Sequence, residues 1–156
     1  MGKSKGSSMS KRRRARRIAV ECLYQWDLGG LDIDAAVADY IPGRVADERI
    51  RREASALVTG TAARIADIDR RLGAVIRHWS EERLAAIDRT ILRLGTYEIL
   101  FREDVPAAAA INEAVELAKL LSSAESGGFV NGVLDEIRRL KETESAAGGA
   151  GPSRTE

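Results

Sequence analysis

One stretch of the chain, residues 87–101, has apolar side chains on almost every side of the helix that its spacing predicts. Such a helix is stable in water only when other elements surround it. We therefore expect the helix from a cap at Asp88 to about Arg102 to be the most buried element. Glu98 lies among these apolar residues, so its carboxylate needs a partner inside the protein. The apolar residues are Ile87, Ile91, Leu92, Leu94, Gly95, Ile99, Leu100 and Phe101.

Helical spacing also describes the rest of the chain, and aromatic residues, which favour strands, make up only 4% of it. About seven helices and no convincing strand predict an all-α fold. The long helix that Asp47 opens contains Gly60 and Gly73, and a kink is expected near either. The other helices are predicted at residues 11–28, 34–41, 80–87, 107–121 and 129–140, with a polar loop or a loose first turn at 122–128.

The two ends of the chain are rich in small and polar residues and lack an apolar face. We expect residues 1–9 to be a disordered basic N-terminus and residues 142–156 to be a disordered tail. The chain is then a single helical domain at residues 10–141.

Residues 11–28 predict an amphipathic helix with two different faces. The predicted core face contains Ala15, Ile18, Ala19, Cys22, Leu23 and Trp26. The opposite face contains Arg13, Arg16, Arg17, Val20, Tyr24 and Asp27. Guanidinium groups pair with phosphate and a tyrosine ring can stack on a base, so this face is typical of nucleic-acid binding. The alternative is a solvated basic face with a half-buried tyrosine.

The charge of the chain is divided unevenly along its length. Residues 1–20 contain eight of the 25 Lys and Arg residues and no acid, so the remainder has 17 basic and 24 acidic residues. The net charge of +1 is therefore the sum of a strongly positive N-terminal end and a mildly acidic remainder of the chain. This pattern indicates an anionic partner at one end.

The sequence offers no pattern of catalytic or metal-binding residues. His78 is the only histidine and Cys22 the only cysteine, so metal-ligand spacing is missing and an intrachain disulfide is excluded. We expect no enzyme activity and no cofactor. No apolar run approaches the ~20 residues that span a bilayer, and the basic N-terminus lacks the apolar segment of a signal peptide. We expect a cytoplasmic protein.

Four blocks of sequence resemble the NusB family of bacterial transcription antitermination factors over about residues 11–138. In chain order they are RRRARRIAVECLYQWDL, DRTILRLGTYEIL, VPAAAAINEAVELAK and FVNGVLD. The resemblance implies two helical bundles packed crosswise and a role without catalysis. Family members bind the boxA element of nascent ribosomal RNA leader transcripts together with NusE, a small-subunit ribosomal protein. That complex joins NusA and NusG on RNA polymerase and supports processive rRNA transcription.

The resemblance also implies which residues of this chain meet each partner. The RNA-contacting residues of the first helix are Arg12, Arg13, Arg16 and Tyr24. A second RNA-contacting segment, between the last two helices, contains Lys119, Leu121, Ser123 and Glu125. Leu121 stands where the family can have an aromatic residue, so a stacking contact is expected to be missing. The stretch around Glu82 and Asp88 is implied to meet NusE.

Three other functions fit an all-α basic chain. A DNA-binding regulator would need a short second helix rich in base-reading residues, which we do not find. The accessory domain of an rRNA cytosine methyltransferase would need a catalytic half for which 156 residues leave no room. A self-associating helical protein stays open, because a homodimer could cover the basic helix.

Overall fold

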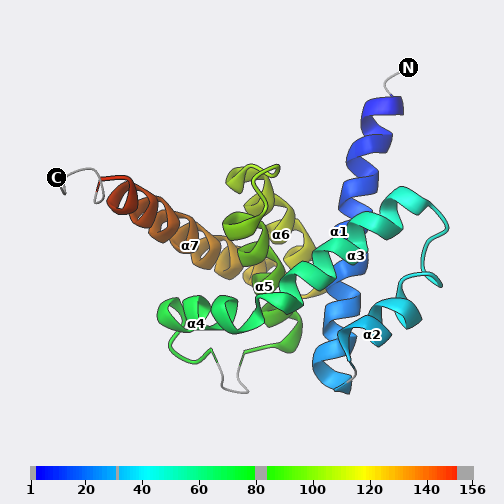
Figure 1. Ribbon diagram of the computed structural model, residues 1–156, viewed down its shortest axis with the longest axis horizontal. Coiled ribbons are helices and arrows are strands. Elements are labelled where there is room, and N and C mark those ends of the chain that lie inside the picture. The colour runs from blue at the N-terminus through cyan, green and yellow to red at the C-terminus, as the bar shows by residue number, and fades with distance from the viewer. Residues whose placement is uncertain (1–2, 31, 80–83, 151–156) are drawn as a thin grey trace.

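The computed structural model describes residues 3–30, 32–79 and 84–150, with side chains from residue 11 to residue 148 of these ranges. Within them the backbone forms helices and turns and no strand, which confirms the all-α prediction (Figure 1). The helices are α1 (Lys3–Gly29), α2 (Ile33–Tyr40), α3 (Glu48–Ala63), α4 (Ile65–Val75), α5 (Ala86–Phe101), α6 (Ala107–Leu121) and α7 (Ala124–Ala150).

Local sequence explains where several helices begin and end. The Asp47 carboxylate accepts hydrogen bonds from the backbone N–H groups of Arg49 and Ile50 at 2.8 and 3.3 Å, so it caps α3 as predicted. Gly30 follows the end of α1 with φ of 70°, a left-handed conformation in which glycine has no steric penalty. These signals act within one helical turn, so the sequence alone could locate them.

The predicted long helix at residues 47–78 is two helices. The chain turns at Arg64, four residues after Gly60, and the Arg64 guanidinium lies 4.3 Å from the centre of the Phe101 ring of α5. Gly60 itself lies against the Tyr97 hydroxyl, where a Cβ atom would collide. The break therefore occurs where the chain packs against α5, which no helical period could locate. Of the helix expected at 80–87, residues 80–83 lie outside the described part and α5 begins only at Ala86.

The helices form two groups that meet at α5. α1 packs against α2 and α3, whereas α6 and α7 pack against each other and against α5. α5 also contacts α1, α3 and α4. Figure 1 shows α1 running upright with α2 and α3 beside it, while α7 leads away to the left. This is the expected crosswise arrangement of two bundles, and α5 is buried on several sides because both groups cover it.

Both terminal helices are longer than the sequence predicted. α1 extends back to Lys3, and α7 continues to Ala150. Elongating a helix that is already held by packing costs little, because only the first turn carries the cost of nucleation. Within α7, Glu144 accepts hydrogen bonds from Arg71 of α4 at 3.2 Å. Residues 1–2 and 151–156 lie outside the described part.

Candidate nucleic-acid interface

The outer face of α1 presents three of the four RNA contacts predicted on this helix. Arg12 and Arg13 are exposed, and Tyr24 is half-buried three turns further along the helix. The Arg13 side chain is 58% exposed, enough for its guanidinium to reach a ligand. The packing that holds this face outward comes from Ala15 and Ala19, which are fully buried on the opposite side. The predicted amphipathic character of this helix is therefore confirmed for these residues.

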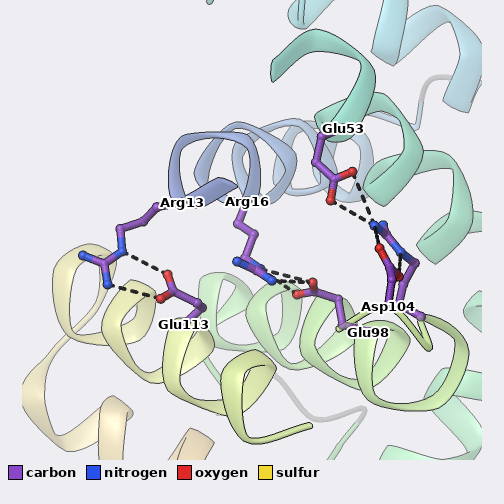
Figure 2. A network of polar contacts seen from close by, with 7 residues as sticks. Arg13, Arg16, Glu53, Glu98, Asp104 and Glu113 are labelled. Carbon is purple, nitrogen blue, oxygen red and sulfur yellow. Dashed lines mark hydrogen bonds and ion pairs between the residues drawn. The ribbon is translucent and has the colours of Figure 1, made fainter. Parts of the chain in front are cut away.

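Arg13 already has a carboxylate partner within the protein. Its Nε and Nη2 atoms donate to Oε1 and Oε2 of Glu113 on α6, at 3.1 and 3.2 Å (Figure 2). This two-point geometry matches the fork of the guanidinium to the carboxylate. The hydrogen bonds and charge of Glu113 raise the pKa of Arg13. A phosphate that used the same edge of the guanidinium would have to displace Glu113.

The predicted exposure of Arg16 is wrong. Arg16 is only 7% exposed, and its guanidinium makes three hydrogen bonds of 3.0–3.1 Å with Glu98 of α5 (Figure 2). Val20, one turn later, is fully buried as well. A wheel drawn for one helix assumes a single buried face, whereas α1 packs against α5 in addition to α3. Arg16 is thus the internal partner that Glu98 was predicted to need.

Glu98 is a carboxylate held inside the protein by this one guanidinium. Burial raises the pKa of Glu98, and the hydrogen bonds and charge of Arg16 oppose that shift. A second set of ion pairs lies just past the end of α5, where Arg102 donates to Glu53 of α3 and to Asp104, with N–O distances of 3.1 and 2.9 Å (Figure 2). The Arg16–Glu98 and Arg102–Glu53 ion pairs therefore fix how α1 and α3 pack against α5.

The second predicted segment lies at the junction of α6 and α7. The loop is only Ser122 and Ser123, because α7 begins at Ala124. The Ser123 hydroxyl accepts a hydrogen bond from the Ser126 backbone N–H at 3.1 Å, which caps α7. Ser123 and Glu125 are exposed, as expected of contact residues.

The two remaining residues of the second segment differ in exposure. Lys119 is exposed and forms a 3.6 Å ion pair with Glu116. Leu121 is partly buried and packs against the core, so its side chain is not a free surface group. Gly127 lets α7 approach α6 closely, since a Cβ atom there would lie 2.9 Å from Cγ of Lys119. The segment is therefore a compact helix junction and not an extended loop.

The residues expected to meet a protein partner have a different placement. Asp88 is only 7% exposed, so little of its side chain is open to a partner in the free protein. Its carboxylate accepts a hydrogen bond of 3.0 Å from the Ser126 hydroxyl, in the first turn of α7. The positive end of the α7 dipole favours a carboxylate at this position, so Asp88 stabilises the start of α7 next to the α6–α7 junction. Glu82 lies outside the described residues.

A groove between α1 and α6 connects the first segment to arginines outside the set of RNA contacts that the family resemblance implies. Arg14 and Arg17 belong to the arginine-rich run, so the sequence did contain a signal for them. Arg44 lies in the turn between α2 and α3 with no such signal, because only tertiary packing brings it beside α1. The groove is lined by Arg13, Arg14, Arg17, Ile18, Glu21, Arg44, Leu117 and Leu120.

The described residues were compared with the side-chain groups of metal sites and with the helices that cross membranes. No group of His, Cys, Asp or Glu side chains there has the arrangement needed to hold a metal ion. Across the same ranges, no helix combines the length and the apolarity required to span a lipid bilayer.

The sequence and the fold match characterised proteins over most of the chain. A transcription antitermination protein NusB from Symbiobacterium thermophilum is 42% identical over 146 residues, covering 88% of this chain and 94% of the relative. The T. maritima NusB structure superposes with a TM-score of 0.74 at 33% identity, over 82% of this chain and 90% of that one. A crystal structure of the antitermination factors NusB and NusE in complex with double-stranded RNA superposes with a TM-score of 0.77 at 28% identity. The superposition covers 85% of this chain and 98% of that chain.

The sequence pattern of the NusB family matches residues 13–139, which span α1 through most of α7. With this match and relatives above 40% identity over most of the chain, the protein is a member of the NusB family.

Proposed function

We propose that this protein is an RNA-binding transcription antitermination factor that binds RNA together with NusE. The observation that carries the proposal is the outer face of α1, where exposed Arg12 and Arg13 lie on the same helix as the half-buried Tyr24. Arginine supplies charge for phosphate, and a tyrosine ring supplies a surface for a base. The antitermination relatives and the NusB structure with NusE and double-stranded RNA support the same function.

The proposed RNA target is the boxA element of ribosomal RNA leader transcripts. We assign its contacts to two segments: Arg12, Arg13 and Tyr24 on α1, and Lys119, Leu121, Ser123 and Glu125 at the α6–α7 junction. Leu121 can offer only its partly exposed aliphatic edge, so stacking there is absent from the proposal. Arg16 is omitted because its guanidinium is buried against Glu98.

The proposed NusE surface is the stretch around Glu82. Asp88 belongs to the same stretch of sequence, and its buried carboxylate accepts a hydrogen bond from the Ser126 hydroxyl in the first turn of α7. Through the complex with NusE, the protein would join NusA, NusG and RNA polymerase during rRNA synthesis. The protein would act in the cytoplasm, where these partners are.

The test is binding of purified protein to a boxA-containing RNA, with and without NusE. Coupling between two ligands of one protein is typically ~1–3 kcal/mol, so NusE should tighten RNA binding about 5- to 150-fold. Single-stranded and double-stranded forms of the RNA are compared in parallel. If saturating NusE left the RNA affinity unchanged, joint binding would be refuted. Sedimentation of the free protein tests whether a homodimer competes for the same face.

Within α1, two variants separate stacking from packing. Tyr24→Ala should weaken RNA binding by about 1–3 kcal/mol if the ring stacks on a base, and Tyr24→Phe should keep most of that energy. Circular dichroism of both variants serves as the folding control. Normal RNA binding by Tyr24→Ala would remove the tyrosine from the proposed site, and its unfolding would assign the ring to packing.

A further inference from the structure

The groove between α1 and α6 combines positive charge with an exposed apolar side chain. Leu120 of α6 is 62% exposed, one of the most exposed large hydrophobic residues described. Beneath it, Ile18 and Leu117 are buried and supply an apolar floor. Arginines from α1 and from the α2–α3 turn surround this apolar surface. A guanidinium rim around an aliphatic floor offers pairing to a phosphate and contact to the flat face of a base.

The single carboxylate of the groove is already engaged. Glu21 accepts a hydrogen bond from the Arg17 guanidinium at 3.3 Å and another from the Tyr40 hydroxyl at 2.9 Å. The groove therefore has a net positive charge, and Glu21 can neutralise little beyond Arg17. An anionic occupant fits this balance.

Two arginines of the groove have no carboxylate partner among the described residues. Arg14 donates only to the backbone carbonyl oxygen of Arg44, at 3.4 Å. The Arg44 guanidinium lies over the Tyr40 ring, 4.6 Å from its centre, so it is held by an aromatic face. Arg14 and Arg44 can both donate to a ligand without breaking an ion pair. Arg13, by contrast, must release Glu113 before the guanidinium edge that holds this carboxylate can bind a ligand.

We propose that this groove binds a further stretch of single-stranded RNA, which leaves the α1 site at Arg13 and reaches Arg44 of the α2–α3 turn. The inference rests on the proposed function, because Arg13 belongs both to the proposed RNA face and to the groove. Because the groove begins at a residue of the proposed RNA face, RNA is a better occupant than an acidic peptide. Such a peptide would also be negatively charged, but nothing would lead it from the RNA face into the groove. Arg44 binds a phosphate, and Leu120 contacts an unpaired base.

The experiment compares two RNAs on the full-length protein by fluorescence anisotropy. One is a minimal boxA RNA, and the other carries a few extra unpaired nucleotides at each end. Arg44→Ala should weaken binding of the extended RNA about three- to tenfold at low salt and lower its salt slope by about 0.7, the value for one phosphate of a single strand. The minimal RNA should bind this variant normally.

Leu120→Ser probes the apolar part of the groove independently. This variant should bind the extended RNA more weakly than the unaltered protein at every salt concentration. The salt slope of binding should be unchanged, because no charge is removed. The matched charge control is Arg52→Ala on α3, which removes an arginine whose side chain is 75% exposed and does not line the groove. This control should bind both RNAs like the unaltered protein.

The outcomes distinguish this inference from the proposed function. If Arg13→Ala weakens both RNAs while Arg44→Ala behaves like Arg52→Ala on both, the groove path is refuted and the proposed function stands. If Arg13→Ala also binds both RNAs normally, the proposed function itself fails. If the extra nucleotides added no affinity, and a poly-glutamate peptide bound the unaltered protein more tightly than it bound Arg44→Ala, the groove would be assigned to an acidic protein segment instead.

Discussion

The ion pair between Arg16 and Glu98 makes the sharpest prediction about this fold. The two side chains are 9% and 2% exposed, and the guanidinium uses both Nε and Nη2 on the carboxylate. Removing one partner leaves a buried charge without compensation, which typically costs about 3–5 kcal/mol. We expect Arg16→Met and Glu98→Leu each to lower the free energy of unfolding by about this amount.

The surroundings of the pair determine what a double variant should do. Ile91, Leu94 and Leu117 line the same small cavity as Arg16 and Glu98, so the pair lies in an apolar environment. Replacing both members of a buried pair by apolar residues of similar volume is often neutral or stabilising. Arg16→Met combined with Glu98→Leu should therefore recover most of the stability that either single change loses.

Urea unfolding followed by circular dichroism measures these differences as a double-mutant cycle. Thermal unfolding gives a second readout: about 3–5 kcal/mol in a chain of this length corresponds to a Tm lowered by about 6–20 °C. Arg12→Met is the matched control, since Arg12 is an exposed arginine of the same helix and should change stability by no more than about 0.5 kcal/mol. If Arg16→Met matched Arg12→Met in stability and lost RNA affinity, Arg16 would face solvent and our placement would be refuted.

Four other features of the molecule can be tested by similar means. Glu113→Gln should raise RNA affinity several-fold in a binding titration, because phosphate no longer competes with a carboxylate for Arg13; unchanged or weaker binding would mean that Glu113 positions Arg13 instead. Lys11 and the N-terminus of α3 hold the pKa of Asp47 below its ordinary value of 3.8. The ionised Asp47 side chain therefore stabilises the fold above pH 3.8, and this stabilisation is lost as the pH falls through the lower pKa of the folded protein. The stability advantage of the unaltered protein over Asp47→Asn in urea should accordingly shrink on acidification, and a constant difference would contradict the ion pair. Burial raises the pKa of the Cys22 thiol to about 11, so Ellman's reagent at pH 8 should react slowly with the native protein and completely in denaturant; rapid native labelling would show that the thiol is accessible. Removing residues 1–9 and 143–156 should leave one cooperative transition, since the Arg71–Glu144 ion pair that this truncation breaks is exposed and typically worth no more than about 1 kcal/mol; a Tm lowered by more than about 4 °C would contradict this.

Helix type, approximate helix limits and the need of Glu98 for a partner could all be derived from the sequence. Helical periodicity and caps depend on residues three or four positions apart, so Asp47 and Gly30 mark helix ends whatever surrounds them. The sequence also predicts that residues 88–101 lie at the centre, because an apolar circumference needs neighbours on every side.

Tertiary structure decided which of the arginines faces inward and which residues form a surface together. Arg16 and Glu98 are 82 positions apart, and nothing in the local pattern distinguishes Arg16 from Arg12 or Arg13. The same holds for Asp88, which turns toward Ser126 of α7, and for Arg44, which meets α1 only because α2 folds back on it. Sequence periodicity describes one helix in isolation, whereas the number of faces that a helix buries depends on how many other helices pack against it.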